Sequence, residues 1–273
     1  MNVKLDPQLG HVQKTLFLPL WGRAVETRKP KPRLVDKTAV QIIEQVDYDF
    51  TPLAQNMDPL SQLAWIRRSQ IGDQVIGRFL DAHPDGAVVN LGCGLDTTCD
   101  RIDNGQLSWY DLDLPDVIAL RRQFIPETAR RTFIAASLLD PAWPDCLRPH
   151  RDLFFLAAGV LYYFTEPEVK GLFLRLLEVF PGSQILFDVS SPTGVRVANK
   201  KVIESAGLDE KSYLIWGVEN KKELLTWDPR LKLLGAHYYY RTWGLGLRNQ
   251  LMGALSDYLG IQYMLHLQLG ERA

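Results

Sequence analysis

The stretch GAVVNLGCGLDTTCDRIDNGQLSWYDLDLP, residues 86–115, decides the fold. An apolar segment runs to Leu91 and is followed at once by Gly92, Cys93 and Gly94. Glycines lack a Cβ, so they let the backbone pass close to a ligand in dihedral angles that other residues avoid. Because open α/β sheets bind ligands at the carboxyl ends of their strands, the turn after Leu91 is predicted to be a ligand platform.

Two acids follow on the next predicted strand, LSWYDLD. Asp111 and Asp113 lie 19 and 21 residues after Gly92, and an acid at about that distance is placed to accept hydrogen bonds from ribose hydroxyls. NAD and S-adenosylmethionine both carry an adenosine, so the acid pair is compatible with either cofactor.

The third glycine of a dinucleotide fingerprint separates these two cofactors. In G-x-G-x-x-G the last glycine lets the helix present its N-terminus to a pyrophosphate, but here that position is Thr97. The carboxylate of Asp96 beside the turn would repel a pyrophosphate and tolerate a sulfonium or an ammonium. The pattern therefore favours S-adenosylmethionine, and the alternative is an ordinary strand–turn–helix with incidental glycines.

From Gly86 onward, apolar runs alternate with segments that have helical periodicity, which is typical of an α/β fold with a mainly parallel sheet covered on both faces. Seven strands are predicted, at 86–91, 107–112, 131–136, 152–158, 183–190, 231–240 and 260–268. The last two surround a predicted helix within residues 246–260.

The first 85 residues are predicted to be helical. Within them, residues 59–82 space their apolar side chains three and four apart, which predicts one long amphipathic helix. Thr165 and Glu168 form a capping pattern for a helix that stops at Pro181. No internal repeat or low-complexity linker is visible, so we expect an N-terminal helical lid or cap over residues 1–85 and one integrated core domain over residues 86–273.

Composition narrows the classes of protein. The chain has 273 residues, 46% of them hydrophobic, and a formal net charge of -1, as in ordinary soluble globular proteins. Neither nucleic acid nor an anionic membrane is expected as a partner, because both select for excess Lys and Arg. The run LFLPLW is much shorter than the roughly 20 residues of a membrane span. Three cysteines predict a reducing compartment, the cytoplasm, and the five scattered histidines predict no metal centre.

Several motifs together resemble one family. VVNLGCGLDTTCDRI (88–102), YDLDLPDVIALRRQFIP (110–126), the N-terminal stretch 15–50 and AAGVLYYFTEPEVKGLF (157–173) are similar to the leucine carboxyl methyltransferase family, in particular to its bacterial branch. The resemblance implies a class I, Rossmann-like methyltransferase fold with a seven-stranded sheet, S-adenosylmethionine as the cofactor, and O-methylation of a carboxylate or a hydroxyl on a small molecule.

The resemblance also assigns residues. Arg68 in WIRRSQ matches the arginine that binds the methionine carboxylate of the cofactor, Gly92 and Gly94 match the glycine turn, and Asp113 matches the acid that holds the ribose. Lys14 falls where the family has a lysine near the cofactor.

Two positions depart from the family pattern. The acid that follows the third strand, near the adenine, is here Ser137, followed by Leu138, and the glutamate of eukaryotic members at the end of the fourth strand is here Ala158. The predicted cofactor-binding set is Arg68, Gly92, Gly94, Asp96, Asp111, Asp113, Ser137, Leu138 and Ala158.

Methyl transfer from a sulfonium is an in-line displacement, so the enzyme aligns the nucleophile and excludes water. A carboxylate acceptor is ionised at pH 7 and needs groups that hold it rather than a base. The candidates are Lys14, Arg23 and Tyr162 or Tyr163. For Arg23 the alternative is an ion pair with a nearby acid such as Glu26, and strand alternation predicts that at most one of the two tyrosines faces a ligand.

Three functions remain open at this point. A small-molecule O-methyltransferase leads, and the absence of a histidine after a strand end in the catalytic half favours a carboxylate or an acidic phenol as acceptor. An NAD-dependent oxidoreductase and a non-catalytic S-adenosylmethionine-binding protein are the alternatives, because fold alone does not settle function.

Overall fold

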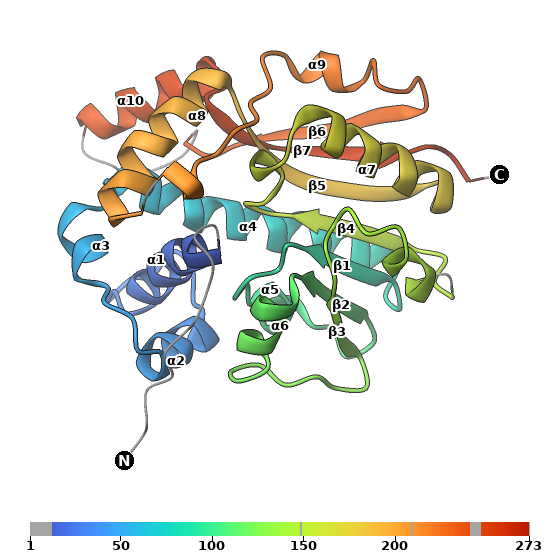
Figure 1. The fold of residues 1–273 in the computed structure, drawn as a ribbon, viewed down its shortest axis with the longest axis horizontal. Helices are drawn as coiled ribbons and strands as arrows, with labels where there is room; N and C mark the ends of the chain where they lie inside the picture. The colour runs from blue at the N-terminus through green and yellow to red at the C-terminus, as the bar shows by residue number, and fades with distance from the viewer. Residues whose placement is uncertain (1–12, 148, 209, 241–246, 273) are drawn as a thin grey trace.

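The computed structural model describes residues 13–147, 149–208, 210–240 and 247–272, and a seven-stranded sheet forms its centre (Figure 1). The strands are β1 (Ala87–Leu91), β2 (Ser108–Asp113), β3 (Arg131–Ala135), β4 (Leu153–Ala157), β5 (Ser183–Ser190), β6 (Leu231–Tyr238) and β7 (Gln262–Leu269). All seven predicted strands are confirmed, with ends that differ by two residues at most.

The strand order is β3-β2-β1-β4-β5-β7-β6, and β7 runs antiparallel to both of its neighbours while the other pairs are parallel. This is the predicted seven-stranded, mainly parallel sheet of class I methyltransferases. The chain order reverses between β1 and β4, and in open α/β sheets the crevice at such a switch point is where ligands bind.

Ten α-helices are assigned in the described part of the chain: α1 (Phe17–Thr27), α2 (Lys37–Gln45), α3 (Thr51–Asn56), α4 (Pro59–Ala82), α5 (Thr98–Ile102), α6 (Pro115–Arg121), α7 (Glu166–Val179), α8 (Pro192–Ala198), α9 (Lys221–Leu224) and α10 (Leu247–Tyr258). A π-helical turn, Asn199–Ile203, continues α8. Short 3-10 turns lie at Gln13–Leu16, Trp143–Leu147, Leu161–Tyr163, Glu204–Ala206 and Glu210–Ser212. In Figure 1, α1, α3, α8 and α10 all lie on the side of the molecule to which the parallel strands point.

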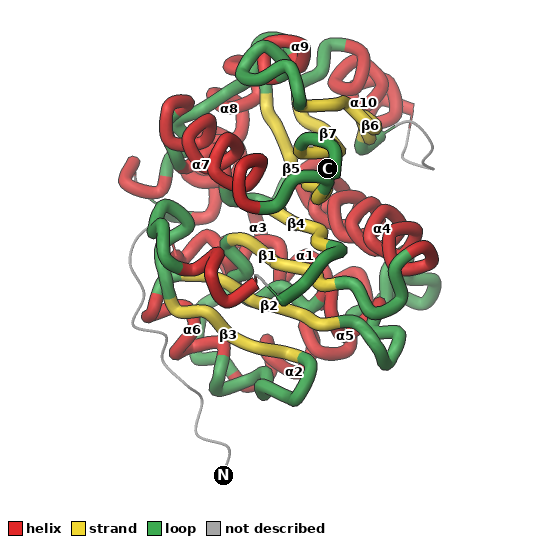
Figure 2. The backbone as a smooth tube through the Cα atoms, turned by 90° about the vertical axis from the view of Figure 1, so that its right-hand side faces the viewer, coloured by secondary structure: helices red, strands yellow, loops and turns green. Residues whose placement is uncertain are grey.

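The predicted long helix over residues 59–82 is confirmed as α4. Asp58 caps it by accepting a hydrogen bond from the backbone N–H of Ser61 at 3.0 Å. Its apolar stripe, which includes Val75 and Phe79, packs on Val88 of β1 and on neighbouring strands. Figure 2 shows α4 on one side of the sheet and α7 on the other, so α4 forms part of the helical layer of the sheet.

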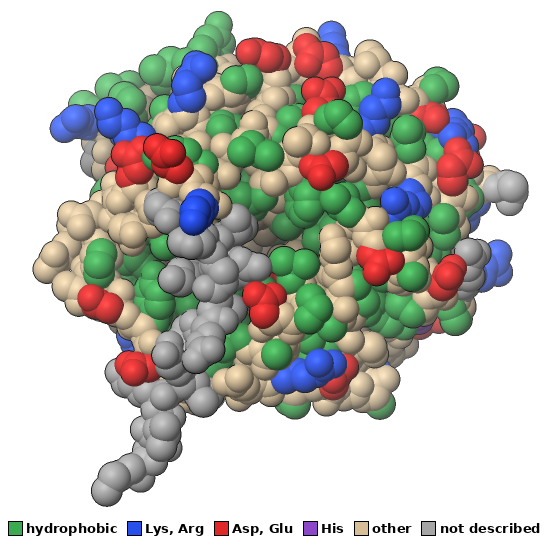
Figure 3. Space-filling view, in the orientation of Figure 1, with side chains coloured by type: hydrophobic (Ala, Val, Ile, Leu, Met, Phe, Trp, Pro, Cys, Tyr) green, Lys and Arg blue, Asp and Glu red, His purple; other side chains and the backbone are tan. Residues whose placement is uncertain are grey.

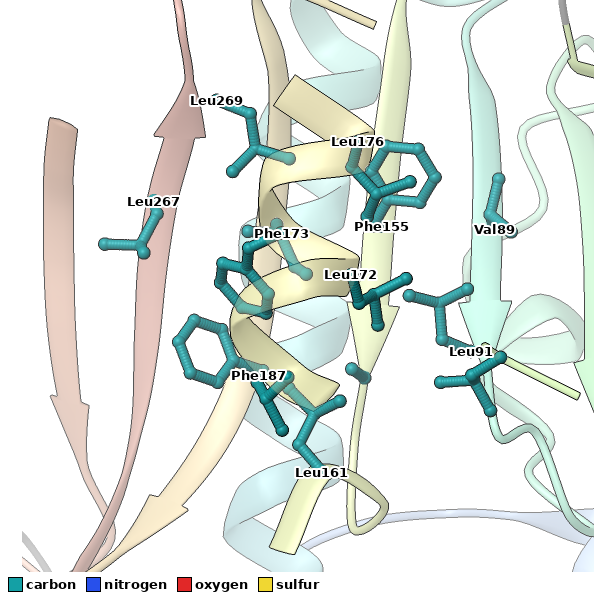
Figure 4. Close-up of a cluster of buried hydrophobic side chains, with 14 of the residues drawn as sticks. Val89, Leu91, Phe155, Leu161, Leu172, Phe173, Leu176, Phe187, Leu267 and Leu269 are labelled. Carbon is teal, nitrogen blue, oxygen red and sulfur yellow. The ribbon is translucent and has the colours of Figure 1, made fainter. Parts of the chain in front are cut away.

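The opposite face of the sheet is covered by α7. The predicted capping pattern is confirmed, because the Glu168 carboxylate accepts from the backbone N–H of Thr165 at 2.7 Å. Phe173 of α7 is fully buried and packs edge-on against Phe187 of β5 at 5.0 Å between ring centroids (Figure 4). These two helical layers exclude water from both faces, which explains the continuously apolar sequence of β4 and the apolar run 185–187 of β5.

Candidate active site

A cavity of about 710 Å³ lies at the carboxyl ends of β1, β2 and β4. Side chains from α1, α4, α8 and α10 enclose it, so it extends from the sheet to the outer helices. Of the residues predicted for the site, those that line the cavity are Arg23, Arg68, Gly92, Gly94, Asp96, Asp113, Ser137, Leu138, Ala158 and Tyr162. The side chain of Lys14 lies outside the described part of the chain.

The glycine turn has the backbone that its sequence predicts. Gly92 and Gly94 have φ angles of +65° and +47°, a region that side chains with a Cβ rarely adopt. A Cβ on Gly92 would lie 2.4 Å from Cγ2 of Val160 in the loop after β4. Gly92 is therefore needed both for its dihedral angles and for the close approach of two strand ends.

Asp113 ends β2 beside this turn. Its carboxylate accepts hydrogen bonds from the backbone N–H of Gly94 at 2.7 Å and of Leu114 at 2.8 Å. Burial raises the pKa of Asp113, although these hydrogen bonds oppose the shift. Each carboxylate oxygen keeps a lone pair that can accept a further hydrogen bond from a ligand hydroxyl.

The prediction that Asp111 binds the cofactor is wrong. Asp111 and Asp113 share a face of β2, but Asp111 pairs in register with Asn90, inside the sheet, and does not line the cavity. It is fully buried and forms ion pairs with Arg121 and Arg131, both at 2.9 Å. Asp111 therefore stabilises the site through these two ion pairs, and its side chain does not reach a ligand in the cavity.

Arg121 connects this buried acid to the turn. Its guanidinium donates to the backbone carbonyls of Gly94 at 2.9 Å and of Asp96 at 2.8 Å. The positive φ angles of the turn are thus stabilised by a buried cation whose charge is balanced by Asp111.

Arg23 lines the cavity, but its ion-pair partner differs from the one predicted. Its Nε donates to Asp36 at 2.8 Å, whereas Glu26 accepts from Lys29 at 2.5 Å. Arg23 also donates to the backbone carbonyl of Leu95 at 3.1 Å. An ion pair is therefore confirmed with Asp36 instead of Glu26, and it ties α1 to the glycine turn.

Thr97, which occupies the third glycine position, is part of the same cluster. Its buried hydroxyl donates to Asp36 at 2.5 Å, and Arg101 donates to Asp36 at 3.1 Å. Burial opposes ionisation of Asp36, but the charges of Arg23 and Arg101 outweigh it and lower the pKa. A glycine at position 97 would remove this hydroxyl, so the departure from the dinucleotide pattern has a structural role.

Asp96 places a negative charge on the cavity wall. Its carboxylate accepts from the backbone N–H of Thr98 at 2.9 Å and from the Asn90 amide at 3.3 Å. Burial favours the neutral acid, yet Arg23, Arg101 and hydrogen bonding by Thr98 lower its pKa to about 2. An ionised carboxylate here suits a cationic ligand group and repels a pyrophosphate, as the sequence predicts.

Arg68, in α4, also lines the cavity. It donates to the Asp188 carboxylate of β5 at 3.0 Å, and the other oxygen of Asp188 accepts from the backbone N–H of Gly159 at 2.6 Å. Burial opposes the charge of Arg68, but Asp188 outweighs it and raises the pKa of the guanidinium. A Cβ on Gly159 would lie 2.7 Å from Arg68 Nη1, so this glycine makes room for the arginine.

Tyr162 and Tyr163 both line the cavity, so the expectation that at most one would do so is wrong. They lie in the 3-10 turn Leu161–Tyr163 and not in a strand, and the alternation argument does not apply to a turn. The hydroxyl of Tyr162 accepts from Arg68 at 3.4 Å, and that of Tyr163 donates to Thr15 at 3.1 Å. Burial raises the pKa of Tyr162 far above its usual value, so it remains a proton donor.

Three residues that the sequence did not single out hold this site together: Asp36, Gly159 and Asp188. Asp188 could have been noticed, because it is the one charged residue in the run QILFDVS. A buried carboxylate requires a cationic or hydrogen-bonding partner. Asp36 follows a charged loop, so an acid at that position did not stand out from its neighbours in the sequence.

The outer half of the cavity differs in character. Its lining residues include Val197 of α8 and Met252, Leu255 and Leu259 in and after α10. No histidine is among the lining residues in the described part of the chain. This half therefore offers apolar surface and no histidine base.

Comparison with known proteins agrees with this geometry. The family described as "Leucine carboxyl methyltransferase" matches residues 17–176. Tetracenomycin polyketide synthesis O-methyltransferase TcmP of Streptomyces glaucescens is 31% identical over 227 residues, which cover 82% of each chain. The S-adenosyl-L-methionine-dependent methyltransferase dpfgK of Gibberella zeae is 27% identical over 282 residues, covering 93% of this chain and 92% of that protein.

Among solved structures, a duf574 family protein from Streptomyces avermitilis superimposes with a TM-score of 0.54 over 91% of this chain and 96% of that one, at 12% identity. At this identity the likeness concerns the fold alone. Within the residues that the structure describes, no helix is both long enough and apolar enough to cross a membrane. On the face shown in Figure 3, acidic and basic side chains are interspersed.

Proposed function

The chain belongs to the leucine carboxyl methyltransferase family of S-adenosylmethionine-dependent methyltransferases, and from this we propose that it methylates a carboxylate or an acidic hydroxyl of a small molecule. The relative TcmP, named as an O-methyltransferase of polyketide synthesis, supports oxygen as the methylated atom and a polyketide or similar secondary metabolite as the acceptor. The three cysteines are free, which is compatible with the cytoplasm as its compartment.

The observation that carries the proposal is the placement of three charges in one cavity. Asp113 offers lone pairs at the glycine turn for ribose hydroxyls, and Asp96 offers an ionised carboxylate for a cationic group. Arg68 uses Nη1 for both of its bonds to neighbouring side chains, so its remaining N–H groups are left for a ligand carboxylate. These donors and acceptors fit S-adenosylmethionine, which supplies a methyl group already activated on a sulfonium.

Ser137 and Ala158 line the same cavity without the acids of other family members. The hydroxyl of Ser137 accepts from the backbone N–H of Leu139 at 3.2 Å, and Ala158 adds only a methyl group. We propose that Asp113, Asp96 and Arg68 are sufficient for cofactor binding without these two acids.

The acceptor side of the site needs no general base if the acceptor is already ionised when it binds. Tyr162 keeps its proton and can donate a hydrogen bond to an acceptor oxygen, whereas its raised pKa makes it a poor base. Arg23 is already paired with Asp36, so we assign it to positioning the glycine turn. The site thus favours an acceptor that is ionised before it binds, such as a carboxylate or an acidic phenol.

The N-terminal segment contributes to the enclosure of the site. Leu16, Leu18 and Pro19 line the cavity, and a Cβ on Gly94 would lie 3.3 Å from Leu16. We propose that the first helices cover the cofactor and exclude water from the reacting atoms.

The proposal is tested by calorimetric titration with S-adenosylmethionine, S-adenosylhomocysteine and NAD. We expect binding of the two sulfur compounds and none of NAD; binding of NAD alone would support the oxidoreductase instead. Asp113→Asn should weaken binding of S-adenosylhomocysteine by about 1–3 kcal/mol, because it loses a charge-assisted hydrogen bond. The control is Asp116→Asn, an exposed acid of α6 that does not line the cavity.

Methyl transfer itself is then measured with tritiated cofactor on a panel of organic acids, phenols and amines. Esters release the label in base, whereas aryl ethers keep it, so base treatment distinguishes a methylated carboxylate from a methylated phenol. Cofactor binding without methyl transfer to any compound of the panel would favour the non-catalytic alternative.

A further inference from the structure

The cations that line the cavity differ in whether they are already paired. In the described part of the chain these cations are Arg23, Arg68 and Lys201. Arg23 is bound to Asp36 and Arg68 to Asp188, each at 3.0 Å or less, with almost complete burial. Lys201 has no hydrogen bond or ion pair with any residue of that part, and it is exposed. It is therefore the cation of the cavity wall whose charge is left for a ligand.

The backbone supports this placement. Lys201 lies in the π-helical turn Asn199–Ile203 that continues α8. A π turn takes one more residue than an α-helical turn and thereby changes the direction of the side chains that follow, and such turns recur at functional sites. Here the amide of Asn199 donates to the backbone carbonyl of Leu214 at 3.0 Å, and its oxygen accepts from the backbone N–H of Leu214 at 2.9 Å. The turn is thus anchored while Lys201 points to the cavity and solvent.

The surface next to Lys201 is apolar. Val197 lies one helical turn earlier on α8, and Met252, Leu255 and Leu259 come from α10 and its end; all four line the cavity and are exposed. In Figure 1, α8 and α10 both lie at one corner of the molecule, and Figure 3 shows hydrophobic side chains at that corner. Exposed apolar side chains that continue a ligand cavity are typical of a binding site.

We propose that the methyl acceptor is an amphipathic organic acid, whose apolar ring body lies against α8 and α10 and whose anionic group, at the solvent end, is bound by Lys201. This inference rests on the proposed function and specifies its substrate class. The bound anion is distinct from the oxygen that is methylated, because Lys201 is exposed at the mouth whereas Tyr162 and Arg68 are buried at the sheet. Lys201 is accordingly a specificity-determining residue.

The test compares 6-hydroxy-2-naphthoic acid with 2-naphthol, which has the same ring body and no carboxylate. Binding of each is measured by calorimetry with S-adenosylhomocysteine at saturation, so the result does not depend on turnover. We expect the wild-type protein to prefer the acid, and Lys201→Gln to weaken binding of the acid by about tenfold with no change for 2-naphthol. The matched control is Lys200→Gln, since Lys200 is exposed on the same turn and does not line the cavity.

The inference is overturned if Lys201→Gln and Lys200→Gln bind the acid equally, or if the wild-type protein does not distinguish the two compounds or binds neither. Affinity for S-adenosylhomocysteine should be the same in all three proteins, which separates a lost anion contact from a damaged fold. The proposed function fails in a different measurement. If no methyl group is transferred to oxygen, the Lys201-dependent preference for binding the acid can still be present.

Discussion

The two ends of the cavity are built differently. At the end that we propose for the cofactor, Asp96, Asp113 and Arg68 each have a partner at 3.0 Å or less. At the end that we propose for the acceptor, Val197 of α8 and Met252 and Leu255 of α10 are apolar and exposed, and Lys201 is unpaired within the described residues. A polar network holds its groups in one geometry, whereas apolar contact accepts many shapes. We therefore propose that the cofactor end is preorganised for one ligand and that the acceptor end selects a class of ligands.

This difference predicts that substitutions at the cofactor end change stability and cofactor binding. Substitutions at the acceptor end should instead change which acceptors bind. The largest expected effect is at Asp188. Asp188→Ala leaves the guanidinium of Arg68 buried without its counter-charge, which should cost about 3–5 kcal/mol in the free energy of unfolding. Urea denaturation followed by circular dichroism measures this.

The matched control for Asp188 is a surface pair. Glu44 binds Arg28 at 2.8 Å with both side chains about half exposed, so Glu44→Ala should cost less than about 1 kcal/mol. Equal losses for the two variants would show that the buried pair is not the support for which we argue.

The glycine turn comes next. Gly92→Ala combines a φ of +65° with a Cβ placed 2.4 Å from Val160, and the sum of backbone strain and crowding should be about 3 kcal/mol. Gly105→Ala is the control, because Gly105 has a φ of +80° and nothing within 4 Å of an added Cβ. It isolates the backbone strain, about 1 kcal/mol. Thermal unfolding of both variants measures the two losses of stability. Equal losses would mean that the close approach of Val160 adds no cost to the substitution at Gly92.

The sheet and the glycine turn were predictable because they depend on local sequence. Apolar runs of five to eight residues bounded by turns define buried strands, and parallel strands bring their carboxyl ends to one edge. Asp113 and Asp96 could therefore be assigned to one site from their positions alone. Asp111 could not be separated from Asp113, because its depth depends on the register that pairs it with Asn90.

The partners of buried charges were not predictable for a related reason. Arg68 and Asp188 are 120 residues apart, and nothing in the spacing of either residue identifies the other. Similarly, Arg23 has acids at both Glu26 and Asp36 within reach along the chain, and the packing of α1 against α2 decides between them. Lys201 lies on a π turn, which a periodicity of 3.6 residues does not reveal.

The charge of Asp96 predicts a pH dependence. Its pKa is lowered to about 2 in the folded protein, from about 3.9 in an unfolded chain. A lowered carboxyl pKa stabilises the folded state above the unfolded value, and this stabilisation is lost as the pH falls through the folded value. Asp96→Asn should therefore reduce the free energy of unfolding at pH 7 by about 2.6 kcal/mol, and it should flatten the loss of stability between about pH 4 and pH 2.

Urea denaturation at a series of pH values measures the effect of Asp96→Asn. Asparagine keeps an oxygen that can accept from Thr98, so the charge is removed while this hydrogen bond can be retained. Asp116→Asn should leave the curve unchanged, since its carboxylate is exposed. Parallel curves for the wild-type protein and Asp96→Asn would contradict the assignment of a stabilising charge to the cavity wall.

The smallest expected effect on stability is at the acceptor end. Leu255 is 49% exposed and lines the cavity, so Leu255→Ala should change the free energy of unfolding by less than about 0.5 kcal/mol. Affinity for S-adenosylhomocysteine should not change either. Binding of 2-naphthol should weaken by about 0.5–1 kcal/mol, because apolar contact area is lost.

The control is Leu247 of the same helix, which is 75% exposed and does not line the cavity. Leu247→Ala should change neither the free energy of unfolding nor the binding of 2-naphthol. If Leu255→Ala instead weakened the fold or the binding of S-adenosylhomocysteine, the two ends would be coupled, and α10 would belong to the preorganised part of the site.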